Sequence, residues 1–199
     1  MKNFGLSICL FLTATVSLFA QNKPEDFGLP ELHIIKTVTL GPSYSCRSHE
    51  DFKKGYQNTA LFLSTWGKKY NTPDLLFNGA CKSEDYLETP DYFSLIADLG
   101  PEVALEEVSE ARAFNLKGAP CFTAYSKFTQ KVEIKVNNTY AVLLNGVARR
   151  GLFVFKVTEY VPNERITFRY AVKRYQIIKD GGVYSEGSNP EKTNYSAQP

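Results

Sequence analysis

The sequence predicts a mainly β protein, either an antiparallel β-sandwich or a partly open barrel, with a C-terminal four-strand meander and one or two short helices. Stretches of alternating polar and apolar residues are frequent, and β-branched and aromatic residues are common within them. Gly, Pro, Asn and Asp lie between these stretches at short intervals, as in sandwiches and barrels. Aromatic residues make up 14% of the chain. This composition favours a globular core and argues against a solvated coil.

The first twenty residues predict a secretory signal peptide at 1–20. Lys2 precedes an apolar run from Leu6 to Phe19, which stops at Ala20 before a polar stretch. A basic start, a short apolar run and a small residue at the exit are typical of such a signal. The run is shorter than the roughly 20 residues that a membrane span needs. We therefore expect a secreted, extracellular protein with no membrane span.

The remaining chain is long enough for one well-filled core. We expect a single β-rich domain at 31–179 and a flexible polar tail at 180–199, because the tail is rich in Gly, Ser, Asn and Pro. In an oxidising compartment cysteines form disulfides, and we predict the pair Cys46–Cys81 because both lie in polar, turn-like settings. Cys121 has apolar neighbours. The alternatives are Cys81–Cys121 and a bridge between two molecules.

The N-terminal half of the domain is predicted to contain strands that end at turn residues. Strands are expected at 33–40, 74–77 and 92–97. The segment 50–70 has apolar residues at helical spacing, yet glycines bracket its second part, so we expect a short helical turn followed by a strand at 60–66. The composition of 102–113 suits one helix.

The C-terminal half predicts four strands with short connections. Residues 131–136 alternate between polar and apolar, and Asn137-Asn138 tolerate positive φ, so a tight hairpin with 139–144 is expected. The segments 151–160 and 165–175 then return around a turn at Pro162-Asn163. The sequence therefore predicts an antiparallel meander.

Catalytic and metal-binding motifs are sparse. Only two histidines occur, which does not favour a zinc site, so no metal and no cofactor are expected. Cys46 and His49 are close in sequence, an arrangement that a thiol nucleophile could use, but we expect Cys46 to be bridged. The carboxylates clustered early in the chain are interpreted as a solvated acidic face, with calcium binding as the alternative. These are Glu84, Asp85, Glu88 and Asp91, followed by Glu102, Glu106, Glu107 and Glu110.

Charge is divided unevenly along the chain. Residues 117–179 contain twelve Lys or Arg against three acids, a net of +9, whereas 22–116 contain nine against fifteen, a net of −6. Strand alternation places the cations of 165–175 on the face opposite the apolar side chains, and Arg149 and Arg150 are expected in a neighbouring loop. We therefore predict a basic sheet face that binds an anionic ligand. Its residues are Lys131, Lys135, Arg149, Arg150, Lys156, Arg165, Arg169 and Lys173.

Together these features favour a secreted, non-catalytic β-domain that binds an extracellular protein, or an anionic glycan or surface through the basic face. A barrel that carries a small hydrophobic ligand is the alternative, because the aromatic residues could line its interior. A secreted hydrolase is the second alternative. Intracellular nucleic acid is not an expected partner. Asn137 and Asn194 begin Asn-x-Ser/Thr triplets and are predicted glycosylation sites.

Overall fold

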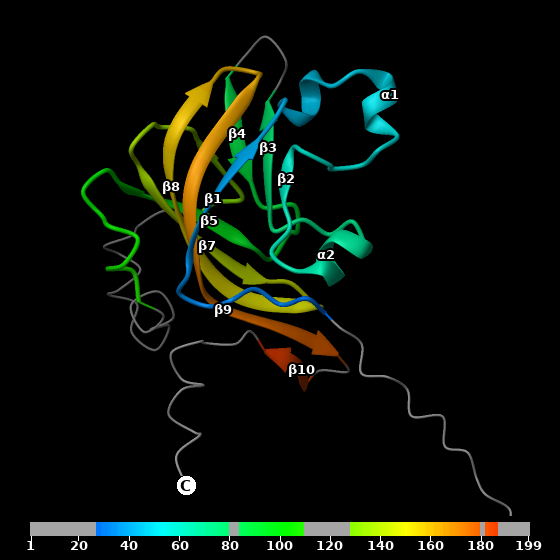
Figure 1. Ribbon diagram of the computed structural model, residues 1–199, viewed down its shortest axis with the longest axis vertical. Helices are drawn as coiled ribbons and strands as arrows, with labels where there is room; N and C mark the ends of the chain where they lie inside the picture. The colour runs from blue at the N-terminus through cyan, green and yellow to red at the C-terminus, as the bar shows by residue number, and fades with distance from the viewer. Residues whose placement is uncertain (1–26, 80–83, 110–127, 180–181, 187–199) are drawn as a thin grey trace, which may run out of the picture.

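Two antiparallel β-sheets pack face to face in the computed structural model, which describes residues 27–79, 84–109, 128–179 and 182–186 (Figure 1). The larger sheet has the order β1-β9-β8-β7-β5, with β10 paired to β9. Its strands are β1 (Ile35–Leu40), β5 (Leu95–Gly100), β7 (Thr139–Asn145), β8 (Arg149–Val161), β9 (Arg165–Lys179) and β10 (Gly182–Glu186). The smaller sheet has the order β2-β3-β4-β6, formed by β2 (Ala60–Leu61), β3 (Leu75–Gly79), β4 (Asp85–Glu88) and β6 (Lys131–Glu133). The mainly β, antiparallel architecture predicted from the sequence is confirmed.

Two short α-helices and one 3-10 turn lie between the first strands. They are η1 (Tyr44–Cys46), α1 (His49–Phe52) and α2 (Thr65–Lys69). Ser64 begins α2 by accepting a hydrogen bond from the Gly67 amide at 3.0 Å, which is the usual role of a serine at this position. The predicted strand at 60–66 is therefore wrong beyond residue 61, because the Ser64 cap starts a helix there.

Aromatic side chains fill the space between the two sheets. Tyr140 stacks on Phe155 with ring centroids 5.0 Å apart, and Phe155 contacts Phe168 at 4.9 Å. All three side chains are fully buried. Burial of one such side chain contributes about 1.5–3 kcal/mol, so this stack is a main source of the stability of the fold. In the described part of the chain, no helix is long and apolar enough to cross a membrane.

The outer face of the larger sheet also has apolar residues that are covered. Leu105 and Val108 pack against Leu152, Val154 and Ala171 in a second hydrophobic cluster. Residues 102–109 form turns, not the predicted helix, and 110–113 lie outside the described residues. Packing of Leu105 and Val108 against the sheet outweighs the modest helix propensity of the segment.

The predicted hairpin between 131–136 and 139–144 is wrong, because β6 and β7 belong to different sheets. Strand β6 pairs with β4, and β7 pairs with β5 and β8. Between them Asn137 does have the expected positive φ of 69°. Its amide donates to the Val157 carbonyl at 2.9 Å. The segment between β6 and β7 is therefore hydrogen-bonded to β8 and does not form a hairpin with β6. The meander consists of β7, β8, β9 and β10.

Strand β10 lies within the segment predicted as a flexible tail. Gly182–Glu186 pair with β9 in antiparallel register, so the expectation of a tail beginning at residue 180 is wrong for these residues. Residues 180–181 and 187–199 lie outside the described part of the chain. The predicted signal peptide at 1–20 also lies outside it.

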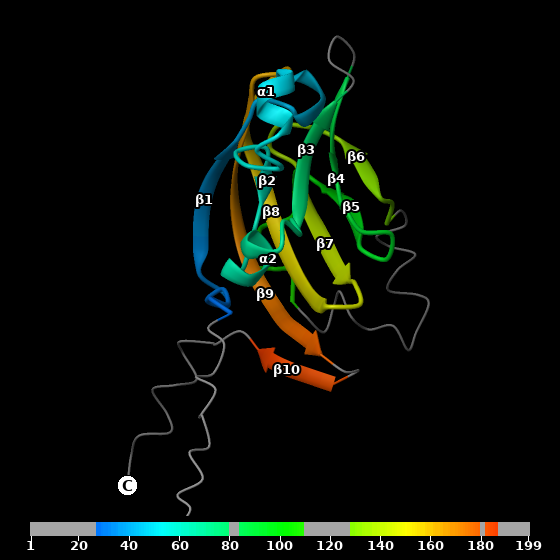
Figure 2. The ribbon, with the colours of Figure 1, turned by 90° about the vertical axis from the view of Figure 1, so that its right-hand side faces the viewer.

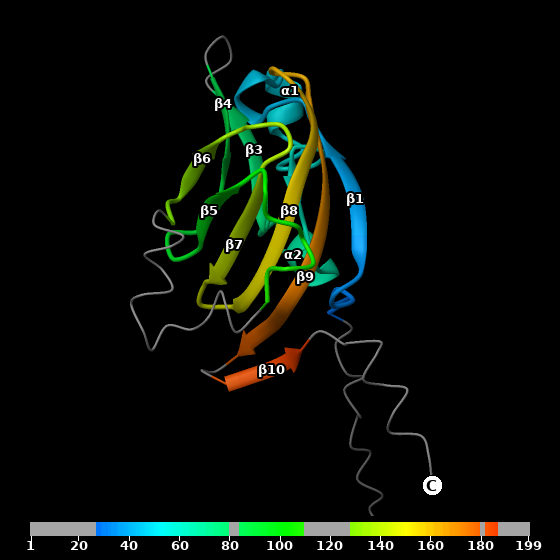
Figure 3. The same ribbon diagram turned by 90° about the vertical axis from the view of Figure 1, so that its left-hand side faces the viewer.

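The two sides of the sandwich differ. On one side an isolated bridge between Ile96 and Thr129 links the edge of β5 to the segment that leads into β6 (Figure 3). On the other side β1 and β2 lie beside each other, between α1 and α2 (Figure 2). In the described residues β1 pairs only with β9, and β2 only with β3. The sandwich is therefore open along the β1/β2 side.

Candidate functional site

The eight basic residues predicted to form one face lie in different environments. Lys131 and Lys135 belong to β6 and the turn after it, in the smaller sheet, whereas the others lie on β8 and β9. Arg149 and Arg150 were expected in a loop, but they are the first two residues of β8. Five of the eight are exposed, Lys156 is half-buried, and Arg149 and Lys173 are buried. The five exposed residues are Lys131, Lys135, Arg150, Arg165 and Arg169.

Acidic side chains and the segment 101–109 interrupt the predicted basic face. Arg165 pairs with Glu159 at 2.8 Å, and Lys135 pairs with Glu133 at 3.3 Å. Lys173 is only 7% exposed, and burial lowers its pKa while nearby Glu106 opposes that shift. Lys156 and Arg169 are direct cross-strand partners on the outer face. The structure therefore brings these two cations together but does not produce a continuous row of eight.

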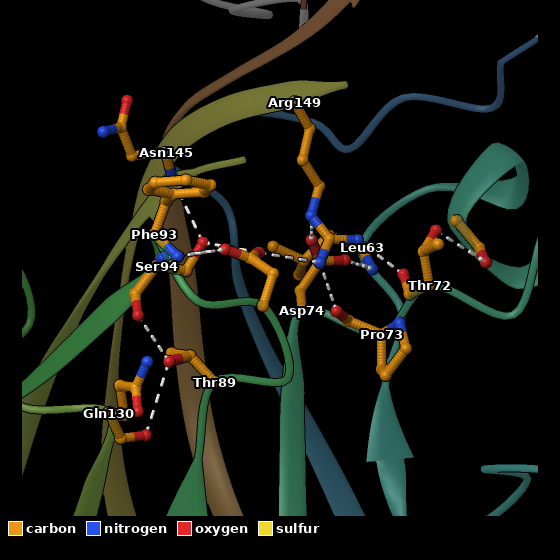
Figure 4. Close-up of polar contacts among 12 residues, drawn as sticks. Leu63, Thr72, Pro73, Asp74, Thr89, Phe93, Ser94, Gln130, Asn145 and Arg149 are labelled. Atoms are coloured by element: carbon orange, nitrogen blue, oxygen red, sulfur yellow. Dashed lines mark hydrogen bonds and ion pairs between the residues drawn. The ribbon is translucent and has the colours of Figure 1, made fainter. Parts of the chain in front are cut away.

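Arg149 points into the sandwich and forms the centre of a buried polar cluster (Figure 4). Its Nε atom lies 3.3 Å from Asp74 Oδ1, and its Nη2 atom lies 3.4 Å from Asp91 Oδ2. The guanidinium also donates to the carbonyls of Thr72 and Pro73. These contacts join residues before β3, after β4 and at the start of β8. A buried cation is tolerated only with such complete pairing.

Asp74 is the most deeply buried member of this cluster. Its Oδ2 atom accepts from the Leu63 amide at 2.8 Å, and its Oδ1 atom accepts from the Tyr175 hydroxyl at 3.4 Å. Burial raises the pKa of Asp74 to about 6, and the charge of Arg149 only partly opposes this. The carboxyl group therefore titrates closer to neutral pH than an ordinary aspartate.

Asp91 holds the loop between β4 and β5 in place. Its Oδ1 atom accepts from the Ser94 amide at 2.7 Å, and its Oδ2 atom accepts from the Ser94 hydroxyl at 2.6 Å. The Ser94 hydroxyl in turn accepts from the Asn145 amide at 3.1 Å, at the end of β7. This chain of bonds, drawn in Figure 4, fixes the β4–β5 loop next to the β7–β8 turn.

Arg149 also lines a small pocket next to the β7–β8 turn. This turn lies at the end of the sandwich opposite α1 (Figure 2). We call this region the loop end and define it by residues 70–74, 89–94 and 146–148. The pocket measures about 220 Å³. Its lining residues are Trp66, Thr72, Asp91, Gly146, Val147, Ala148 and Arg149.

Exposed hydrophobic side chains concentrate at the loop end. Val147 is 85% exposed and Tyr92 is 80% exposed, and Tyr70 and Phe93 are also mostly exposed. The described residues include six large hydrophobic side chains with high exposure, and these four are among them. Single exposed hydrophobic residues are ordinary, but a group around a pocket is typical of a contact surface.

The remaining predicted sites have mixed outcomes. The Cys46 thiol donates to Asn163 Oδ1 at 3.2 Å. Cys81 lies outside the described residues, so the predicted disulfide stays a prediction. His49 is exposed at the start of α1. Asn137 is exposed in its turn, and Asn194 lies outside the described residues.

The acidic cluster is not uniformly solvated. Asp85 is buried and accepts from the Tyr160 hydroxyl at 3.0 Å, and Asp91 pairs with Arg149. The expected solvated acidic face is therefore wrong for these two residues, because their partners lie inside the fold. In the part of the chain that the structure describes, no three His, Cys, Asp or Glu side chains are grouped so that they could hold a metal ion.

Comparison of this chain with family models, curated proteins and solved structures finds no match. The site therefore has to be interpreted from its own residues. The loop end was not found by sequence reasoning. Its only signals are Gly146-Val147-Ala148 between two strands and the adjacent aromatic residues Tyr92 and Phe93 after a strand.

Proposed function

We propose that this protein is a secreted, non-catalytic β-domain that binds an extracellular protein partner through the loop end. The observation that carries this proposal is that exposed hydrophobic residues lie next to the pocket: Val147 lines it, Tyr70 contacts the lining residue Trp66, and Tyr92 and Phe93 follow the lining residue Asp91. Loops on a rigid sandwich are common positions for recognition residues. The predicted signal peptide supports secretion.

The size of the pocket favours a macromolecular partner. Sites for whole small molecules usually measure about 300–1,000 Å³, whereas this pocket measures about 220 Å³. It suits one apolar side chain of a partner, with Val147 and Ala148 as its apolar wall. Anchors of this kind, surrounded by aromatic residues, supply most of the binding energy in many protein interfaces.

The polar cluster under the pocket has a positioning role in this proposal. Asp74, Asp91 and two carbonyls satisfy the guanidinium of Arg149. The cluster therefore fixes the loops that present the hydrophobic residues. Such rigidity reduces the conformational entropy lost on binding. We do not propose a hydrolase, because the Cys46 thiol donates to the Asn163 amide oxygen and the carboxylates of Asp85 and Asp91 are engaged in the fold.

A peptide-display selection tests the loop end. Random 12-residue peptides are selected against the purified protein, and the affinities of the enriched peptides are measured by biolayer interferometry. We expect peptides with an apolar anchor whose affinity falls about tenfold or more in Val147→Asp, because a charge would line the pocket. Val136→Asp is the matched control, since Val136 is also exposed but lies outside the loop end. Enriched peptides that bind both variants equally well would refute this site.

A second candidate function, binding of an anionic glycan, is favoured by the Lys156–Arg169 pair. These cations face each other across β8 and β9, and Lys156 also donates to the Pro101 carbonyl at 3.0 Å. Like charges at opposite positions of two strands are unfavourable, and an anion would offset this. We expect Arg169→Glu to elute from heparin at clearly lower salt than the wild type. Arg165→Glu is the control and should shift elution less, because Arg165 is already paired with Glu159. Equal shifts, or no retention of the wild type, would exclude this pair as the contact.

A further inference from the structure

A second concave surface lies along the open side of the sandwich, between the edges of β1 and β2. The groove has a volume of about 450 Å³, within the range of small-molecule sites. The groove and the Arg149 pocket share no lining residue. It is therefore a separate candidate site.

The walls of this groove are apolar and polar in similar measure and come from four segments of the chain. Strand β1 contributes Val38 and Leu40, and the segment of β2 contributes Ala60, Leu61 and Phe62. Tyr170 from β9 also lines it. The polar lining residues are Thr39, Gln57, Asn58 and Lys68. An amphipathic ligand would place its apolar body against the apolar part of this surface and its polar group against the rest.

Backbone hydrogen bonds connect the segments that precede and follow β1 with the segments that flank β2. On one side the Gly41 amide donates to the Asn58 carbonyl at 2.6 Å. On the other side the amides of Thr65 and Trp66 donate to the carbonyls of Gly28 and Phe27, both at 3.2 Å. A continuous polypeptide would have to break these connections to run between β1 and β2 as an added strand. The groove therefore favours a compact ligand over an inserted strand.

Lys68 gives the groove a definite charge. It is exposed in the last turn of α2, and among the described residues it is the only Lys, Arg, Asp or Glu that lines the groove. The nearest basic residue on β1, Lys36, is already paired with Glu31 at 3.0 Å. An anionic group at Lys68 would complement this charge, and a cationic group would not.

We propose that the groove between β1 and β2 binds a small amphipathic anion, with its apolar chain against Val38, Leu61 and Phe62 and its carboxylate at Lys68. This inference is independent of the proposed function at the loop end. It names a second site with its own ligand class. The shape and the charge of the groove carry it together.

Dodecanoate, used below its critical micelle concentration, is the probe that tests this site by isothermal titration calorimetry. We expect one molecule to bind per protein, with an affinity about tenfold or more weaker in Lys68→Glu. Lys69→Glu is the matched control on the same helix, because Lys69 does not line the groove. Gln57→Trp, at an exposed residue of the wall, should obstruct the groove and abolish binding without disturbing the core.

Two further measurements distinguish binding in this groove from binding driven by the alkyl chain alone and from binding at the loop end. Dodecyltrimethylammonium, which has the same chain and the opposite charge, should bind at least tenfold more weakly than dodecanoate. Val147→Asp should bind dodecanoate as the wild type does, so that failure at the loop end and failure at the groove are distinguishable. No heat with dodecanoate, equal losses in Lys68→Glu and Lys69→Glu, or equal binding of both detergents would each overturn the proposal.

Discussion

Among single residues, Arg149 has the most demanding environment in the described chain. It is 5% exposed, and its charge is balanced by one fully buried carboxylate, Asp74, and one half-buried carboxylate, Asp91. Removing one partner of a buried ion pair leaves the other charge without compensation, which is far more costly than breaking an exposed pair. The loop end therefore depends on this side chain for its structure.

Replacing Arg149 by methionine should destabilise the protein by about 3–5 kcal/mol, because buried Asp74 would lose its main partner and would have to stay charged without compensation or take up a proton. Urea unfolding at pH 8 measures this loss. Arg165→Met removes an exposed pair with Glu159 and should cost less than about 1 kcal/mol. Similar losses in the two variants would show that the Arg149 cluster does not stabilise the fold.

The raised pKa of Asp74 predicts an unusual dependence of stability on pH. The folded state binds the proton more tightly than the unfolded state, so this group stabilises the fold at low pH and loses that contribution as pH rises through about 6. The difference between 3.8 and about 6 corresponds to about 3 kcal/mol.

Urea unfolding of the wild type and Asp74→Asn between pH 4 and pH 8 isolates this contribution. The free energy of unfolding of the wild type should fall relative to that of Asp74→Asn as pH rises. A constant difference between the two proteins across this range would contradict the assignment.

Individual strands could be predicted from the sequence, but their partners could not. Alternation at 131–136 correctly predicted a strand there, although β6 ends at Glu133, and the same alternation cannot specify which sheet a strand joins. The choice is made by tertiary contacts. The Tyr140 hydroxyl accepts from the Lys135 amide at 2.8 Å and donates to the Glu133 carbonyl at 3.0 Å, which fixes the crossing between the sheets.

Removing the Tyr140 hydroxyl tests this account of the crossing. Tyr140→Phe should lower the free energy of unfolding by about 1–2 kcal/mol, because the backbone groups of Glu133 and Lys135 lose their partner. Thermal and urea unfolding measure the change. Tyr92→Phe alters an exposed ring and should have little effect. If Tyr140→Phe were equally neutral, another contact would have to direct β6 to the smaller sheet.

The candidate site was less predictable than the strands. Periodicity placed Arg165 and Arg169 correctly on the outer face of β9, but an irregularity in the β8–β9 pairing next to Lys173 disturbs that alternation. Arg149 follows a turn and is preceded by exposed Val147, so its sequence context suggests a solvated residue. Its buried partners are distant in sequence, and only the folded chain brings them together.

At the scale of the whole molecule, two features determine where a partner can bind. The interior of the sandwich is filled, and in the described part of the chain only its β1/β2 side is open. The stack of Tyr140, Phe155 and Phe168 occupies the space in which a barrel would carry its ligand. Binding surfaces are therefore expected at the periphery: the loop end for a protein, and the open β1/β2 side for a small amphipathic anion. The sandwich acts as a rigid support for both.

Backbone amide chemical-shift mapping with a peptide obtained by display selection is the most direct test of the central claim, that the loop end is the contact surface. Titration of the ¹⁵N-labelled protein should shift the amides of residues 70–74, 89–94 and 146–148 most strongly. Shifts centred instead on Lys156 and Arg169, or on Val38 and Leu61, would contradict the claim and move the contact to the outer face or the groove.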